Sequence, residues 1–172
     1  MEREDIVLKN LAQEIRFSKH EFIRLNKLDQ KRFKTKIELL DFDKVDGISE
    51  RLMLLLHEEN PITTDNSRIP YGNILLKGNF SIESLIDLTA KAFKTGNKVA
   101  IQSDLITSNS YQFINKAWQS VLASQGYDSS RIQFLDLEKS FDLKADFFIE
   151  SISMQNGFFE LEDFTMFLSQ KE

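Results

Sequence analysis

Residues able to carry covalent chemistry are few in this sequence. The 172 residues contain no cysteine, which excludes a thiolate nucleophile, a disulfide and a thiolate metal site. Ser103 and Ser108 lie outside any glycine motif that would form a nucleophile elbow. His20 and His57 are far apart and belong to different helical patterns, so the sequence predicts no metal site.

One polar stretch is a better candidate for binding a ligand. Gln102, Ser103 and Asp104 follow an apolar run, at the place where dinucleotide-binding folds use glycine and the start of a helix to hold the phosphates. Asp104 can accept hydrogen bonds from a ribose, although its charge would repel a 2′-phosphate. The stretch has no glycine to let backbone approach a phosphate closely. We therefore take these three as candidate cofactor-binding residues, while expecting no bound cofactor.

Alternating strands and helices must position these residues. Short apolar runs predict buried parallel strands, and a period of three to four residues predicts helices between them. Strands are expected at 73–77, 99–102 and 131–135, helices at 81–94 and 108–124, and a further strand within 141–149. Ser81 and Ser108 suit helix N-caps, while Gly96 and Gly126 suit helix ends. The pattern predicts an α/β fold with a short, mainly parallel Rossmann-like sheet and flanking helices.

An N-terminal helical region precedes this sheet. Apolar residues recur with a helical period over residues 4–30. Two helices are expected there, breaking near residues 17–19, with Ser18 and Glu21 as a capping box. Further helical blocks are predicted at 31–40 and 43–59.

Several segments, in this order, resemble one known family. Residues 68–72 read Arg-Ile-Pro-Tyr-Gly, residues 79–80 read Asn-Phe, and residues 95–101 read Thr-Gly-Asn-Lys-Val-Ala-Ile. The sequence thereby resembles the aldehyde dehydrogenase superfamily, and most closely γ-glutamyl phosphate reductase (glutamate-5-semialdehyde dehydrogenase). The resemblance implies a single domain, 1–172, in three parts. These are N-terminal helices (1–60), a remnant of a dinucleotide-binding domain (61–137), and C-terminal strands with a tail (138–172).

The resemblance also implies chemistry that this chain cannot complete. The family consists of NADP-dependent oxidoreductases, this branch belonging to proline biosynthesis, in which a cysteine attacks the substrate carbonyl. Without a cysteine that covalent intermediate cannot form. Asn79 matches the family's oxyanion-donating asparagine and is a vestigial candidate, with a plain strand-to-helix turn as the alternative. We expect a truncated relative that lacks the catalytic domain.

The tail resembles the family's oligomerisation strand. The match is best at residues 161–162 and 164–167. The apolar residues expected to make the contact are Phe158, Phe159, Leu161, Phe164 and Phe167. Because this segment pairs with a neighbouring subunit in the family, we expect a homodimer or association with a full-length reductase.

Charge and hydropathy exclude other classes of partner. The net charge is −5, and basic residues are scattered apart from a short run at 27–36, so nucleic-acid binding is not expected. No apolar run approaches the roughly 18 residues of a membrane span, and no signal peptide opens the sequence. We predict a cytoplasmic protein that does not bind membranes.

Three functions remain open at this point. The first is a catalytically inactive relative of the reductase that serves as an interaction or regulatory subunit. The second is a small-molecule or nucleotide-binding module with its ligand near Asn79, Gln102 and Ser103. The third is an oxidoreductase completed by a partner that supplies the cysteine. We rank them in this order.

Overall fold

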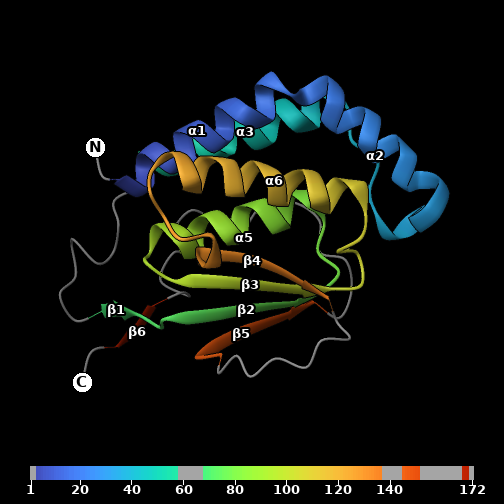
Figure 1. Cartoon of the computed structure of the whole chain (residues 1–172). Helices are drawn as coiled ribbons and strands as arrows, with labels where there is room; N and C mark the ends of the chain where they lie inside the picture. The colour runs from blue at the N-terminus through green and yellow to red at the C-terminus, as the bar shows by residue number, and fades with distance from the viewer. Residues whose placement is uncertain (1–2, 58–67, 137–144, 152–167, 171–172) are drawn as a thin grey trace.

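A computed structural model describes residues 3–57, 68–136, 145–151 and 168–170 (Figure 1). The helices are α1 (Arg3–Phe17), α2 (Lys19–Phe33), α3 (Phe42–Leu56), α5 (Ile82–Lys94) and α6 (Asn109–Ser124), with short 3-10 turns η1 (Lys34–Lys36) and η2 (Ser129–Arg131). The strands are β1 (Arg68–Pro70), β2 (Asn73–Gly78), β3 (Lys98–Ser103), β4 (Ile132–Asp136), β5 (Phe147–Ser151) and β6 (Leu168–Gln170).

The centre of the fold is a four-stranded parallel sheet in the order β4-β3-β2-β5. Helices α5 and α6 connect β2 to β3 and β3 to β4, and both lie on one side of the sheet (Figure 1). Alternate strand residues such as Ile74, Leu76, Val99 and Ile101 are buried beneath these helices. The predicted α/β class with a mainly parallel, Rossmann-like sheet is confirmed. The fourth strand, β5, begins within the stretch 141–149 where a strand was expected and extends past it to Ser151, while residues 141–144 lie outside the described part of the chain.

The N-terminal helices form a further layer over α5 and α6. Helices α1 and α3 pack side by side above them, and α2 continues along α6 (Figure 1). Their apolar faces join those of α5, α6 and the sheet in one core. The layer is therefore held to the sheet mainly through α5 and α6.

Two segments that carried the family resemblance meet at the amino ends of the strands. The Asn97 side chain accepts a hydrogen bond from the backbone N–H of Gly72 at 2.9 Å, and the Lys98 N–H donates to the Gly72 carbonyl at 2.8 Å. Gly96 ends α5 with φ of +93°, a left-handed conformation that favours glycine, as its position predicted. The turn after α5 thus sets where β2 and β3 begin.

Helix boundaries in the N-terminal region correct two predictions. Ser18 marks the break between α1 and α2, but its side chain makes no capping hydrogen bond. The predicted helix at 31–40 is wrong: α2 ends at Phe33, and after η1 the backbone is extended at Ile37. Tertiary contacts explain the extension, because the Asn26 side chain donates to the Glu38 carbonyl and accepts from the Leu40 N–H.

The last described strand pairs within the chain. β6 is antiparallel to β1, with Leu168 opposite Pro70 and Gln170 opposite Arg68. The tail residues proposed for oligomerisation, 158–167, lie outside the described residues.

Candidate functional site

The carboxyl ends of β2, β3 and β4 form the edge where parallel α/β sheets bind ligands. Two of the predicted site residues meet here. The Ser103 hydroxyl donates to Oδ1 of Asn79 at 3.0 Å and accepts from the Leu105 N–H at 3.1 Å. Ser103 is fully buried and Asn79 is half-buried, so their polar groups are engaged with one another inside the protein.

The other two predicted residues point away from this pair. Gln102 alternates with Ser103 along β3 and therefore lies on the opposite face of the sheet, in register with Lys77 and Leu135. Asp104 is exposed, with a carboxylate oxygen 3.9 Å from the Lys36 ammonium. Gln102, Ser103 and Asp104 thus do not converge on one cleft.

Tyr111 also contacts the chain at this edge of the sheet, although the sequence indicated only that it lies on the apolar face of a helix. The Tyr111 hydroxyl, from α6, donates to the Phe80 carbonyl at 2.7 Å and accepts from the Phe80 N–H at 3.0 Å. Burial raises the pKa of Tyr111. The ring therefore acts as a neutral link between α6 and the end of β2. A tyrosine among apolar residues was the available signal, because a buried hydroxyl requires a partner.

The start of α6 is already bound by an internal carboxylate. Asp29, from α2, is buried and accepts from the backbone N–H groups of Asn109 and Ser110 at 2.8 and 2.7 Å, and from the Ser110 hydroxyl at 2.6 Å. The Ser108 hydroxyl accepts from the Tyr111 N–H at 3.1 Å, so the predicted cap is confirmed. Free N–H groups at a helix start are what bind phosphate in nucleotide-binding folds.

The start of α5 is bound in the same way. Ser81 caps it as predicted, its hydroxyl accepting from the Ser84 N–H at 3.1 Å. Glu38, from the extended segment after η1, accepts from the Ile82 N–H at 3.1 Å. Burial, and then the negative charge of Glu38, raise the pKa of the neighbouring Glu83. The amino ends of both helices beside the sheet therefore hold a carboxylate supplied by the N-terminal region.

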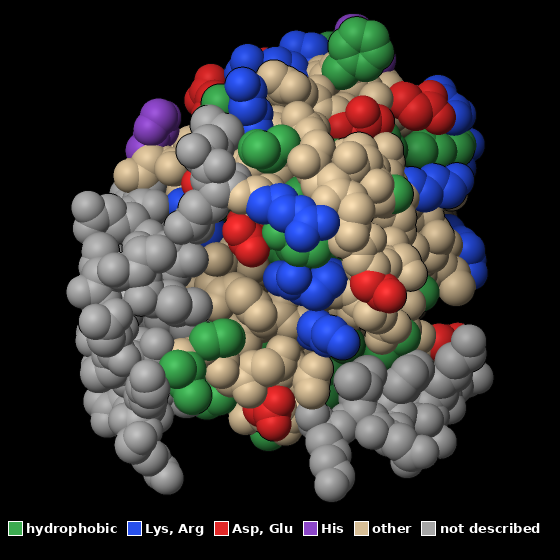
Figure 2. All heavy atoms as spheres, turned by 60° about the vertical axis from the view of Figure 1, so that its left-hand side comes forward, with side chains coloured by type: hydrophobic (Ala, Val, Ile, Leu, Met, Phe, Trp, Pro, Cys, Tyr) green, Lys and Arg blue, Asp and Glu red, His purple; other side chains and the backbone are tan. Residues whose placement is uncertain are grey.

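The described residues hold no cluster of metal ligands, and the face drawn in Figure 2 carries no continuous basic patch. Among the described residues, no three His, Asp or Glu side chains lie close enough to hold a metal ion. On the face seen in Figure 2, Lys and Arg side chains are interspersed with Asp and Glu rather than forming a continuous patch. None of the described helices has the length and hydropathy needed to cross a membrane.

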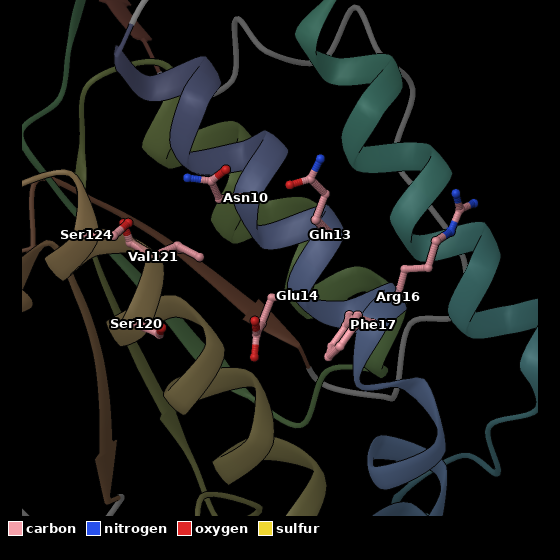
Figure 3. Close-up of a pocket in the computed structure, with 8 residues that line it drawn as sticks. All are labelled: Asn10, Gln13, Glu14, Arg16, Phe17, Ser120, Val121 and Ser124. Atoms are coloured by element: carbon pink, nitrogen blue, oxygen red, sulfur yellow. The ribbon is translucent and has the colours of Figure 1, made fainter.

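A separate groove of about 610 Å³ lies between α1 and α6 (Figure 3). Its lining residues are Asn10, Gln13, Glu14, Arg16, Phe17, Ser120, Val121 and Ser124. None of them belongs to the carboxyl edge of the sheet, and no feature of the sequence had indicated this groove.

Comparison with known proteins identifies the fold. The chain superposes on γ-glutamyl phosphate reductase from Thermotoga maritima with a TM-score of 0.67 at 15% identity, over 77% of this chain and 37% of the reductase. The reductase from Saccharomyces cerevisiae gives 0.66 at 17% identity, over 81% and 41%. The chain shares its fold with part of this reductase.

A match with a lower TM-score also covers most of this chain and a minor part of the other protein. Glyceraldehyde-3-phosphate dehydrogenase from Methanocaldococcus jannaschii, solved with NADP, gives a TM-score of 0.53 at 16% identity, over 78% of this chain and 31% of that one. No family model and no curated protein sequence matches the chain. The chain spans about two fifths or less of the length of the structures that it matches, and identities this low establish the fold alone.

Proposed function

We propose that this chain is a catalytically inactive relative of γ-glutamyl phosphate reductase that acts by associating with another protein chain. That chain is either a second copy of itself or a full-length reductase, which would place it beside proline biosynthesis. One observation carries the proposal: carboxylates of Asp29 and Glu38 hold the helix N–H groups that a nucleotide phosphate would need.

The residue types support the same conclusion. The 172 residues supply no cysteine for the attack on a substrate carbonyl. Oδ1 of Asn79, the vestigial oxyanion candidate, accepts a hydrogen bond from buried Ser103, and the sequence offers no cysteine beside which its amide could act. A donor that has no nucleophile beside it has no oxyanion to stabilise.

Calorimetric titration with NADP and NADPH tests the inactive part of the proposal. We expect no heat of binding at millimolar cofactor. A cofactor phosphate would have to displace the carboxylate of Asp29 or Glu38 from the helix N–H groups and lose its own hydration. Calorimetry is preferred to a fluorescence titration, because the Trp118 side chain is fully buried against Phe93 and would respond weakly to a ligand at the surface. Binding in the micromolar range would support a nucleotide-binding module instead.

Molecular mass in solution tests the association. The comparison is between the full chain and a chain ending at Met154, which removes β6 and leaves β1 without its strand partner. A full chain that is dimeric, or that binds a full-length reductase, supports the proposal, and loss of association on truncation assigns it to the tail. A full chain that is monomeric and binds no reductase would contradict the proposal.

A further inference from the structure

We infer that the groove between α1 and α6 binds helix α2 of a second copy of this chain, with Leu28 of that copy entering beside Phe17 and Val121. The inference rests on the proposed function in one respect, namely that the chain acts by association. It assigns a surface that is separate from the C-terminal tail.

The groove has the form of a helix-binding site. On α1, its lining residues Asn10, Gln13, Glu14 and Phe17 follow the spacing i, i+3, i+4, i+7, so they share one face. On α6, Ser120 and Ser124 are one turn apart, and such small side chains permit close approach of another helix. Figure 3 shows these side chains projecting from the two helices that border the groove.

Exposure of Phe17 argues for a protein partner rather than a small ligand. The Phe17 side chain is 90% exposed, the highest value among the large apolar residues that the structure describes. A small-molecule pocket encloses most of its ligand, and an aromatic ring that stands in solvent cannot do so. An exposed aromatic beside a groove is typical of a surface that another helix covers.

Helix α2 carries the complementary side chains. Its outward face presents Leu28, which is 43% exposed, flanked by Lys27 and Lys31. Among the described residues neither lysine has an acidic partner, and the Glu14 carboxylate in the groove has no basic one. The other charged residue of the lining, Arg16, lies 3.9 Å from the carboxylates of Asp46 and Glu50 on α3, so its charge is already opposed. An apolar side chain between two lysines therefore matches a groove that offers Phe17, Val121 and one unpaired carboxylate.

The position of α2 makes the contact reciprocal. α2 begins at Lys19, two residues after Phe17, so the groove and the helix proposed to fill it adjoin on one molecule. A twofold axis near this junction places α2 of each copy in the groove of the other. Such a contact is closed and self-complementary, as in most homodimers.

The test is the dimerisation constant of the full chain, measured by sedimentation equilibrium over a concentration series. Phe17→Ser should weaken dimerisation at least tenfold, and its melting temperature should equal that of wild type at dilutions where both chains are monomeric, because Phe17 is outside the core of the monomer. Leu54→Ser, which removes a 51% exposed leucine from α3, is the matched control and should change nothing. A wild-type dimer that Phe17→Ser leaves intact overturns this inference but not the proposed function. A monomeric wild-type chain overturns the inference outright.

Charge reversal tests the register of the contact. Glu14→Lys alone, and Lys27→Glu with Lys31→Glu, should each weaken dimerisation several-fold through repulsion. The chain with all three changes should recover to within about twofold of wild type, since the charges are then opposed again with reversed sign. Additive loss in the triple variant would show that these residues do not face one another.

Discussion

At the residue scale, Asp29 is the side chain on which the candidate site depends. It accepts three hydrogen bonds from Asn109 and Ser110 at the positive end of α6, and it is buried. Asp29→Ala should cost about 3 kcal/mol in the free energy of unfolding, because it leaves these donors without a partner. Urea denaturation measures the loss. Asp104→Ala, at an exposed ion pair, is the control and should cost under about 0.5 kcal/mol.

The same variant tests whether Asp29 stands in the place of an anion. Weak anion binding requires a high concentration, on the order of 50–100 mM phosphate or sulfate. At this concentration the anion should raise the melting temperature of Asp29→Ala more than that of wild type. An equal effect on both proteins would indicate that the emptied helix start does not bind anions.

Glu83 gives a prediction of pH dependence. Burial and Glu38 raise its pKa in the folded state above the ordinary value of 4.5, so ionisation of Glu83 opposes folding. This penalty is absent below the unfolded pKa, grows between the unfolded and the folded pKa, and is complete above the folded pKa. Glu83→Gln should therefore stabilise the protein at pH 7, by at most about 0.5 kcal/mol because Glu83 is partly solvated, and have no effect near pH 3.5. Melting curves at the two pH values decide this, and equal shifts at both would contradict the assignment.

At the element scale, α5 departs most from what its sequence indicates. Its apolar residues Ile82, Leu85 and Phe93 are buried, yet Asp87 and Lys91 are also fully buried. The Asp87 carboxylate lies 3.1 Å from the Lys91 ammonium and 3.1 Å from Nε of Arg51 on α3. Charged residues on a helix normally predict a solvent-exposed face, and the packing of α1 and α3 against α5 reverses that expectation.

The buried charges of α5 lead to a stability prediction. Asp87→Asn should cost about 3–5 kcal/mol, because the buried Lys91 ammonium would lose the charge of the carboxylate 3.1 Å away. Urea denaturation measures this loss. Replacing both residues, as Asp87→Leu with Lys91→Met, should recover at least half of it, since no charge of this pair then remains buried. A double variant as unstable as the single one would show that these side chains have other essential partners.

Local signals predicted local structure well in this chain. The caps at Ser81 and Ser108 and the turn at Gly96 depend on residues within four positions, and each is confirmed. The contacts that define the candidate site join residues far apart in sequence, with separations of 44 for Glu38 to Ile82 and 81 for Asp29 to Ser110. A carboxylate in a predicted helix is usually solvated, so no sequence pattern distinguished these two.

At the scale of the whole molecule, the N-terminal helices and the sheet form one structural unit. α2 and the segment after η1 supply the caps of α5 and α6, while one continuous core joins all layers. We therefore expect a single cooperative unfolding transition. Fluorescence of Trp118, buried beside Phe93, should report the same midpoint as far-ultraviolet circular dichroism. Separate midpoints would mean that the N-terminal layer unfolds by itself.

The carboxylate at the start of α6 also constrains how the chain folds. Asp29 emerges from the ribosome 81 residues before Ser110, its most distant partner. Helix α6 can therefore gain its native amino terminus only after a long loop has closed, and contacts of such separation slow folding. The sequence separation of this contact thus bears on how fast the protein folds and not only on how stable it is.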